Sequence, residues 1–145
     1  MKILLGIFLA LAVLVVGYLG YLRFIGNANV MAELKSGDGG ERARKVMIIT
    51  LPDATELPVN YLREQDKVFV GVDGLWWREF REGPTPVTML IRGERLTGQA
   101  LAILDDPDYT ADVFSRLRPT APTWLPGRMK GVLVEIALDA QGEMP

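Results

Sequence analysis

Residues 87–104 have the sequence VTMLIRGERLTGQALAIL, and this stretch decides the fold. Two apolar segments, residues 87–91 and 94–104, are separated by Arg92-Gly93, which is a candidate for a tight hairpin turn. Gly98 interrupts the second segment and indicates a bulge or a tight bend there. The stretch therefore predicts two antiparallel strands joined by a short turn.

Further strands are predicted on both sides of this hairpin, because short apolar runs cover residues 46–51, 57–62, 67–72, 75–80 and 131–137. Both faces of the run at 67–72 are apolar, which is typical of a central strand. Pro52 cannot donate to a strand ladder, so we expect the first strand to end there.

One helix is predicted after the hairpin. Asp105 or Asp106 can cap it, and Pro107 suits its first turn. Pro119 forbids its continuation. Five to seven strands with one or two helices predict a mainly-β domain, a small barrel with accessory helices.

The N-terminal residues 3–22 form an uninterrupted uncharged run rich in Leu, Val and Ala. At 1.5 Å per residue, about 20 helical residues span roughly 30 Å, the thickness of the hydrocarbon core of a bilayer. Tyr18 and Tyr21 lie near its end, where aromatic belts occur, and Arg23 closes it. The run predicts a single transmembrane anchor. A cleaved signal peptide is the alternative, but this run is longer than a typical signal-peptide core.

These patterns predict an anchor at residues 1–25, a linker at 26–44, a barrel domain at 45–138 and a flexible tail at 139–145. The linker is mostly polar, and Arg42, Arg44 and Lys45 follow its glycines. This basic cluster is interpreted as a solvated entrance to the domain, with contact to a lipid headgroup or a cofactor phosphate as the alternative. Counting positive charges on either side of the anchor favours a single-pass protein with a cytoplasmic barrel.

The composition excludes several classes of site. The 145 residues include no cysteine and no histidine, so disulfides, thiol nucleophiles, Ser-His-Asp triads and histidine-ligated metals are excluded. A net charge of −2 does not fit a nucleic-acid partner. No metal site is expected and no catalytic residue can be assigned. An enzyme of this composition would take its chemistry from an organic cofactor.

Two segments resemble the split β-barrel flavin/deazaflavin-binding family, which includes deazaflavin-dependent nitroreductases and pyridoxamine-phosphate-oxidase-like proteins. The first is residues 58–63, followed by Asp66 and the strand at 67–72; the second is residues 76–80, followed by 87–93 and 98–100. The similarity covers roughly residues 44–137. It implies a split β-barrel that binds FMN or a deazaflavin, and a homodimer, since members of the family usually pair.

The resemblance implies a cofactor groove lined by Asn60, Tyr61, Trp76, Trp77 and Arg78. Each residue also has a plainer interpretation. Asn60 suits an exposed strand position, Tyr61 the core, and the two tryptophans packing or an interface, while Arg78 suits a structural ion pair. The function implied is a membrane-anchored oxidoreductase that passes hydride from a flavin or deazaflavin to a small, lipophilic acceptor such as a quinone.

One stretch departs from the family pattern. The family commonly has a glycine-containing basic turn after the first strand, whereas residues 51–56 here read LPDATE. Asp53 and Glu56 would oppose a bound anion. This favours the alternative function, a non-catalytic β-barrel used for binding or assembly at the membrane. In that case Trp124 would mark an interface with a partner or with the membrane surface, unless it only packs its own loop.

Overall fold

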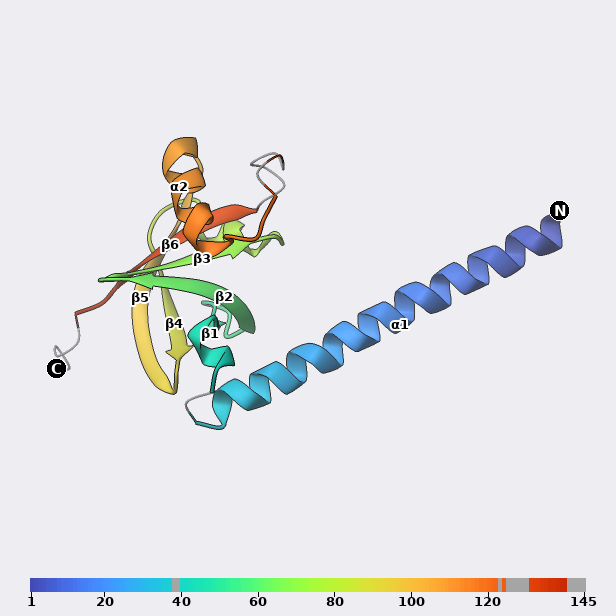
Figure 1. The fold of residues 1–145 in the computed structure, drawn as a ribbon, viewed down its shortest axis with the longest axis horizontal. Coiled ribbons are helices and arrows are strands. Elements are labelled where there is room, and N and C mark those ends of the chain that lie inside the picture. Colours follow the sequence, from blue (N-terminus) through green and yellow to red (C-terminus); the bar gives the residue numbers. More distant parts are fainter. Residues whose placement is uncertain (38–39, 123, 125–130, 141–145) are drawn as a thin grey trace.

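The computed structural model describes residues 1–37, 40–122, 124 and 131–140, so most of the predicted tail lies outside the described residues. A long N-terminal helix leads into a small barrel (Figure 1). The elements in chain order are helix α1 (Lys2–Lys35), 3-10 helix η1 (Arg42–Arg44), strands β1 (Val46–Thr50), β2 (Glu56–Glu64) and β3 (Lys67–Val72), 3-10 helix η2 (Trp76–Phe80), strands β4 (Thr85–Ile91) and β5 (Glu94–Ile103), helix α2 (Pro107–Leu117) and strand β6 (Val132–Leu138).

Six strands form one closed antiparallel barrel in the order β1-β2-β3-β6-β5-β4. The ring is closed between β1 and β4, where Ile49 lies opposite Met89. The last strand, β6, is inserted between β3 and β5. The predicted mainly-β barrel with accessory helices is therefore confirmed.

The predicted hairpin is present as β4 and β5, with Ile91 opposite Glu94. Arg92 and Gly93 have φ values of 51° and 79°, and a type I′ turn requires a positive φ at both positions. Gly98 forms no bulge, because it pairs in register with Val87 and Leu138. A Cβ atom there would lie 2.6 Å from the carbonyl oxygen of Ala137. The glycine therefore lets β6 approach β5 closely.

The predicted strand at residues 75–80 is wrong, because this segment is η2. Its backbone bonds are of the i to i+3 kind: the amide of Arg78 donates to Leu75 O at 3.1 Å. The neighbouring strands explain the difference. β3 already pairs with β2 and β6, and β4 with β1 and β5. The closed ring leaves no edge at which this aromatic segment could add a strand.

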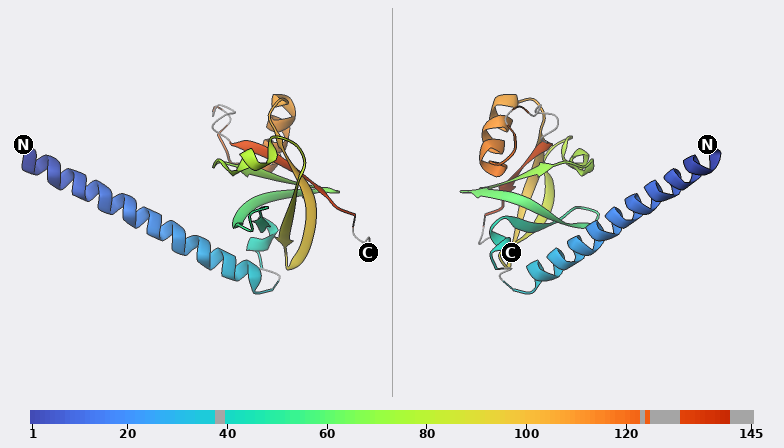
Figure 2. Two further views of the ribbon diagram at one scale, coloured as in Figure 1. Left: turned by 180° about the vertical axis from the view of Figure 1, so that it is seen from behind. Right: turned by 45° about the vertical axis from the view of Figure 1, so that its right-hand side comes forward.

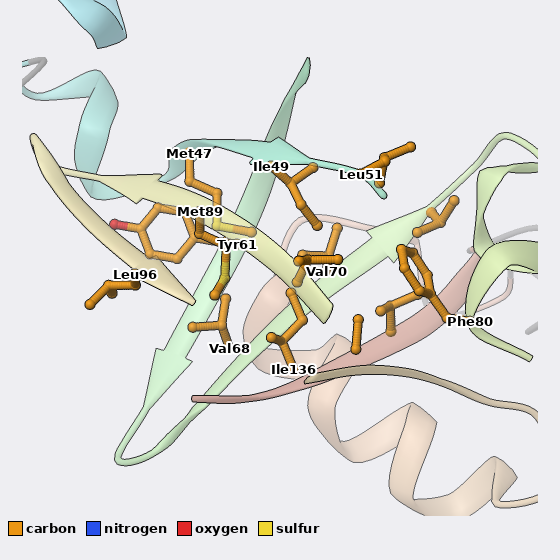
Figure 3. Packing of buried hydrophobic residues seen from close by; sticks show 14 of the residues in the cluster. Met47, Ile49, Leu51, Tyr61, Val68, Val70, Phe80, Met89, Leu96 and Ile136 are labelled. Carbon is orange, nitrogen blue, oxygen red and sulfur yellow. The ribbon is translucent and has the colours of Figure 1, made fainter. Parts of the chain in front are cut away.

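The main core fills the barrel interior. Figure 3 shows that Tyr61 and Phe80 lie at opposite ends of this apolar cluster, with Val70 and Met89 between them. A second, smaller core lies outside the barrel, where α2 packs Val113 and Phe114 against the sheet. α2 confirms the predicted helix, and Asp106 is its cap: a carboxylate oxygen accepts from the amide of Tyr109 at 3.1 Å.

α1 continues through much of the predicted linker and ends only at Lys35. Leu34 is the reason, since it is buried against Ala43 and Ile48 in a third apolar cluster. A salt bridge of 2.6 Å joins Lys35 to Glu56 at the start of β2. The apolar N-terminal part of α1 is covered by no other part of the described chain, and it is long enough to be a candidate membrane span. Figure 2 shows it projecting as a single rod from the barrel.

Candidate functional site

A groove lies between β2 and the C-terminal end of α2, with a cavity volume of about 580 Å³. We call it the α2 groove. Its lining is rich in polar and basic side chains: Arg44, Lys45, Asn60, Asp73, Arg116, Arg118 and Thr120, with Tyr61, Leu62, Leu117, Pro119 and Ala121. The lining thus has four basic residues and one acidic residue, a composition that favours an anion over a cation.

Strand β2 places two predicted site residues in this groove. Neighbouring residues of a strand face opposite sides, so Asn60 is exposed on the outside while the Tyr61 ring is buried in the barrel. The Tyr61 hydroxyl donates a buried hydrogen bond of 2.7 Å to the carbonyl oxygen of Ala43. This bond fixes η1, and it thereby positions Arg44 and Lys45 at the edge of the groove.

Two arginines at the end of α2 are held by carboxylates. Arg116 bonds Glu64 at 2.9 Å and Asp112 at 2.8 Å, and these bonds raise the pKa of its guanidinium. Arg118 bonds Asp73 at 3.0 Å and donates to the carbonyl oxygen of Gly71 at 3.0 Å. Both guanidinium groups are therefore held in fixed orientations.

The remaining two cations are less constrained. Arg44 lies 3.3 Å from the exposed carboxylate of Glu41, and Lys45 forms no ion pair with any described residue. Surface ion pairs of this kind contribute only about 0–1 kcal/mol. Arg44 and Lys45 are therefore the side chains best able to turn toward an incoming anion.

A second cavity of about 430 Å³ opens at the nearby barrel mouth. It shares Arg44, Tyr61 and Leu62 with the α2 groove, so the two cavities adjoin the same side chains. Arg63 and Arg92 add positive charge there, partly offset by Glu94. The basic surface thus extends from the end of α2 across η1 to the turn between β4 and β5.

Neither a family model nor a curated protein matches this chain. The solved structures include a candidate pyridoxamine 5'-phosphate oxidase from Listeria innocua, with a TM-score of 0.54, 14% identity, and coverage of 78% of this chain and 93% of that one. The chain has the split β-barrel fold. Two further structures are more distant: an F420 reductase (TM-score 0.44, 12% identity, 72% and 94% coverage) and a candidate 5-nitroimidazole antibiotic resistance protein from Bacteroides thetaiotaomicron (0.41, 11%, 78% and 80%).

The other three predicted site residues lie elsewhere in the split barrel. Trp76 and Trp77 are on η2, half-buried against the end of the core that contains Phe80. Arg78 is exposed and lies over the Trp77 ring, 5.9 Å from its centroid. Among the described residues that line the α2 groove or the barrel mouth, none belongs to η2. Of the five predicted residues, Asn60 and Tyr61 therefore line the α2 groove, and the three on η2 line neither the α2 groove nor the barrel mouth.

The acidic turn between β1 and β2 has structural partners. Asp53 accepts from the amide of Thr55 at 3.0 Å, and this bond lowers the pKa of its carboxyl group. Glu56 is bonded to Lys35. Neither carboxylate lines the α2 groove. The acidic pair that distinguishes this chain from the family pattern therefore supports the turn and the docking of α1, away from the basic groove.

Only part of this site was predictable from the sequence. Arg44 and Lys45 stood out as a basic cluster, with a cofactor phosphate as one of its alternatives. Arg116 and Arg118 carried no signal of their own, because basic residues are common in the last turn of a helix. Within the described part of the chain, no group of three or more histidine, cysteine or acidic residues could hold a metal ion.

Proposed function

We propose that this protein is a membrane-anchored oxidoreductase that binds FMN or a deazaflavin in the α2 groove. The observation that carries the proposal is the concentration of positive charge beside Asn60 on a split barrel. The Listeria innocua protein that shares this fold is named for an oxidase of a phosphate ester. FMN and the deazaflavin cofactors are themselves anionic through their phosphate groups, and they suit a basic cavity of this size.

The residues divide the work of binding. Arg44 and Lys45 would bind the phosphate, since both can adjust to it. Asn60 would donate or accept at the edge of the ring system, because its amide is exposed in the groove. Arg118 is already anchored to Asp73, and it would fix the wall of the groove. The cofactor supplies the hydride chemistry when bound, and the chain supplies orientation and charge.

The N-terminal helix would place the proposed oxidoreductase at a membrane. It would hold a cytoplasmic barrel close to lipophilic acceptors such as quinones, which accept hydride equivalents from reduced flavins. A homodimer, as the resemblance implies, is also proposed.

Cofactor binding by the full-length chain in lipid nanodiscs tests the proposal. FMN and a deazaflavin would be titrated separately and followed by the fluorescence anisotropy of the cofactor. We expect saturable binding of one of them at micromolar concentration. Lys45→Gln should weaken it about tenfold or more, since a hydrogen bond to a charged group contributes about 1.5–3 kcal/mol.

Two matched variants make the result specific. Arg95→Gln removes an exposed cation of β5 outside the groove and should leave binding unchanged. Arg78→Gln removes the cation of η2. If Arg78→Gln weakened binding and Lys45→Gln did not, the cofactor would lie at the other end of the barrel. Absence of binding to a folded protein would overturn the redox function.

The second candidate is a non-catalytic binding or assembly module at the membrane. It is favoured by the carboxylates already bonded to Arg116 and Arg118, which reduce the positive charge left for a ligand. Under this function neither cofactor binds, and Lys45→Gln leaves partner binding intact.

A further inference from the structure

Two exposed apolar side chains outside α1, Leu75 and Leu104, follow strands that end on the same side of the barrel. Of the described residues beyond α1, three large hydrophobic ones are exposed: Leu75 (65%), Leu104 (50%) and Trp124 (78%). Leu75 follows β3, Leu104 follows β5, and Trp124 precedes β6 in the chain. These are the strand ends opposite the basic barrel mouth. We call this side the η2 end, because η2 with its half-buried tryptophans also lies there.

The three strand ends are neighbours in the sheet. β6 lies between β3 and β5, and its first residues pair with their last ones: Val132 with Val72, and Leu133 with Ile103. Adjacent strands are about 4.8 Å apart. A Cβ atom on Gly131 would lie 2.7 Å from the carbonyl oxygen of Val72. The segments that carry Leu75 and Leu104 therefore start from one small area.

The direction of α1 brings this end toward the membrane. In Figures 1 and 2 the light green η2 lies on the side of the barrel that faces the N-terminal half of α1, in all three views. α1 is held in place relative to the barrel, because Leu34 is buried. In addition, Lys35 forms a salt bridge with Glu56, and Glu33 forms one with Arg42. The barrel is thus fixed to the rod with its η2 end turned back along it.

The length of α1 between its apolar run and the barrel limits the distance between the barrel and the membrane. The apolar run ends at Leu22, and the contacts with the barrel begin at Val30. Eight helical residues raise the attachment point by about 12 Å above the hydrocarbon. The headgroup layer occupies roughly 5–7 Å of that distance. A barrel end that points back along α1 therefore has about 5–7 Å to cover before it meets the lipid headgroups, and about 12 Å before it reaches the acyl chains.

We propose that the η2 end is a second membrane contact, with Leu75 and the η2 tryptophans at the boundary between headgroups and acyl chains. This inference rests on the membrane-anchor part of the proposed function. Tryptophan is enriched at this depth, where its ring is apolar and its N–H remains hydrated. Arg78 over Trp77 can direct its charge outward to a lipid phosphate.

The charged side chains at the η2 end balance one another, so the contact with lipid is expected to be mainly apolar. Exposed Glu79 and Glu82 accompany Arg78 and Arg81, and Arg81 is bonded to Glu82 at 3.0 Å. These four groups carry no net charge, so anionic lipid should not be required. The contact is expected in a bilayer of phosphatidylcholine and should persist at high salt.

Single-cysteine spin labelling of the full-length protein tests the contact, since the natural chain has no cysteine. The variants are Leu75→Cys at the η2 end, Asp66→Cys in the turn at the opposite end, and Leu11→Cys in the anchor. Each is labelled in phosphatidylcholine nanodiscs, and its collision rates with oxygen and with a water-soluble nickel complex are compared. We expect the label at 75 to be several-fold less accessible to nickel than the label at 66, with the label at 11 lipid-immersed.

The three labels separate the possible failures. Equal nickel accessibility at 75 and 66, with a lipid-immersed label at 11, would overturn the second contact and leave the anchor standing. A water-accessible label at 11 would overturn both. Tryptophan quenching by brominated lipid gives a readout without a label. Leu75→Asp should reduce that quenching, whereas Thr97→Asp, on an exposed position of β5, should not.

Discussion

Tyr109 shows how the fold changes the chemistry of a single residue. Its hydroxyl donates a 2.6 Å hydrogen bond to Glu135, whose other oxygen accepts a 2.9 Å salt bridge from Lys67. Burial and the bond to Glu135 raise the pKa of Tyr109 to about 12. Glu135 also raises the pKa of Lys67. One carboxylate on β6 therefore holds a proton donor from α2 and a cation from β3.

A pH dependence of stability follows for Tyr109. The raised pKa means that the folded state retains a proton that the unfolded state loses near pH 10. The stabilisation is complete below about pH 10 and is lost as pH rises toward 12. The unfolding free energies of wild type and Tyr109→Phe, from urea titrations, should therefore converge over this range. Parallel profiles would contradict the assignment. Glu135→Gln should lower the Tyr109 pKa only in part, because burial is the larger cause.

The same scale shows why residue-level predictions succeeded unevenly. Tyr61 had two interpretations, the core and a cofactor groove, and its buried ring also borders the groove. Gly98 was expected to bend its strand, but it is required by the backbone of β6, which comes much later in the chain. No local pattern around Gly98 contains that information. A glycine in a strand predicts that another part of the chain approaches its backbone closely. Only the order of the strands in the sheet identifies that part as β6.

At the scale of elements, the strands were predictable where alternation or a turn pair was strong, as in β3 and the β4–β5 hairpin. The 3-10 helix η2 was not predictable, because its aromatic composition suits a strand. Only the closure of the barrel excludes a strand at this place. The α2 groove was missed for a related reason. It joins Lys45 with Arg118, which are far apart in the sequence and meet only after α2 has packed on the outside of the barrel.

The cap of α2 provides a test at this scale. The sequence left Asp105 and Asp106 as equal candidates, and the structure gives the hydrogen bond to Asp106. Asp106→Ala should lower the free energy of unfolding by about 1 kcal/mol, because it leaves a helix amide without its partner. Asp105→Ala is the matched control and should change it by less than about 0.5 kcal/mol. The rate of hydrogen exchange in the first turn of α2 should rise only in the Asp106 variant. Equal effects of the two substitutions would mean that the Asp106 cap does not stabilise α2.

At the scale of the whole molecule, α1 and the barrel are not separate units. Val30, Met31 and Leu34 of α1 belong to an apolar cluster with Ala43 and Ile48. The expected division into anchor, linker and barrel placed these three α1 residues in the linker. The last turns of the helix instead cover an apolar patch on the outside of the barrel, and that contact fixes the direction in which α1 leaves the barrel.

A soluble domain should therefore be more stable when it keeps the end of α1. Burial of a leucine contributes about 1.5–3 kcal/mol, and each kcal/mol shifts the Tm of a domain of this size by about 4–8 °C. A chain that begins at Glu41 should melt about 6 °C or more below one that begins at Asn29, as followed by circular dichroism. Leu34→Ala in the longer chain should remove most of the difference, whereas Ala32→Gln, on an exposed position of the same helix, should not. Equal melting of the two chains would mean that α1 is only tethered to the barrel, and the fixed orientation behind the second membrane contact would then be lost.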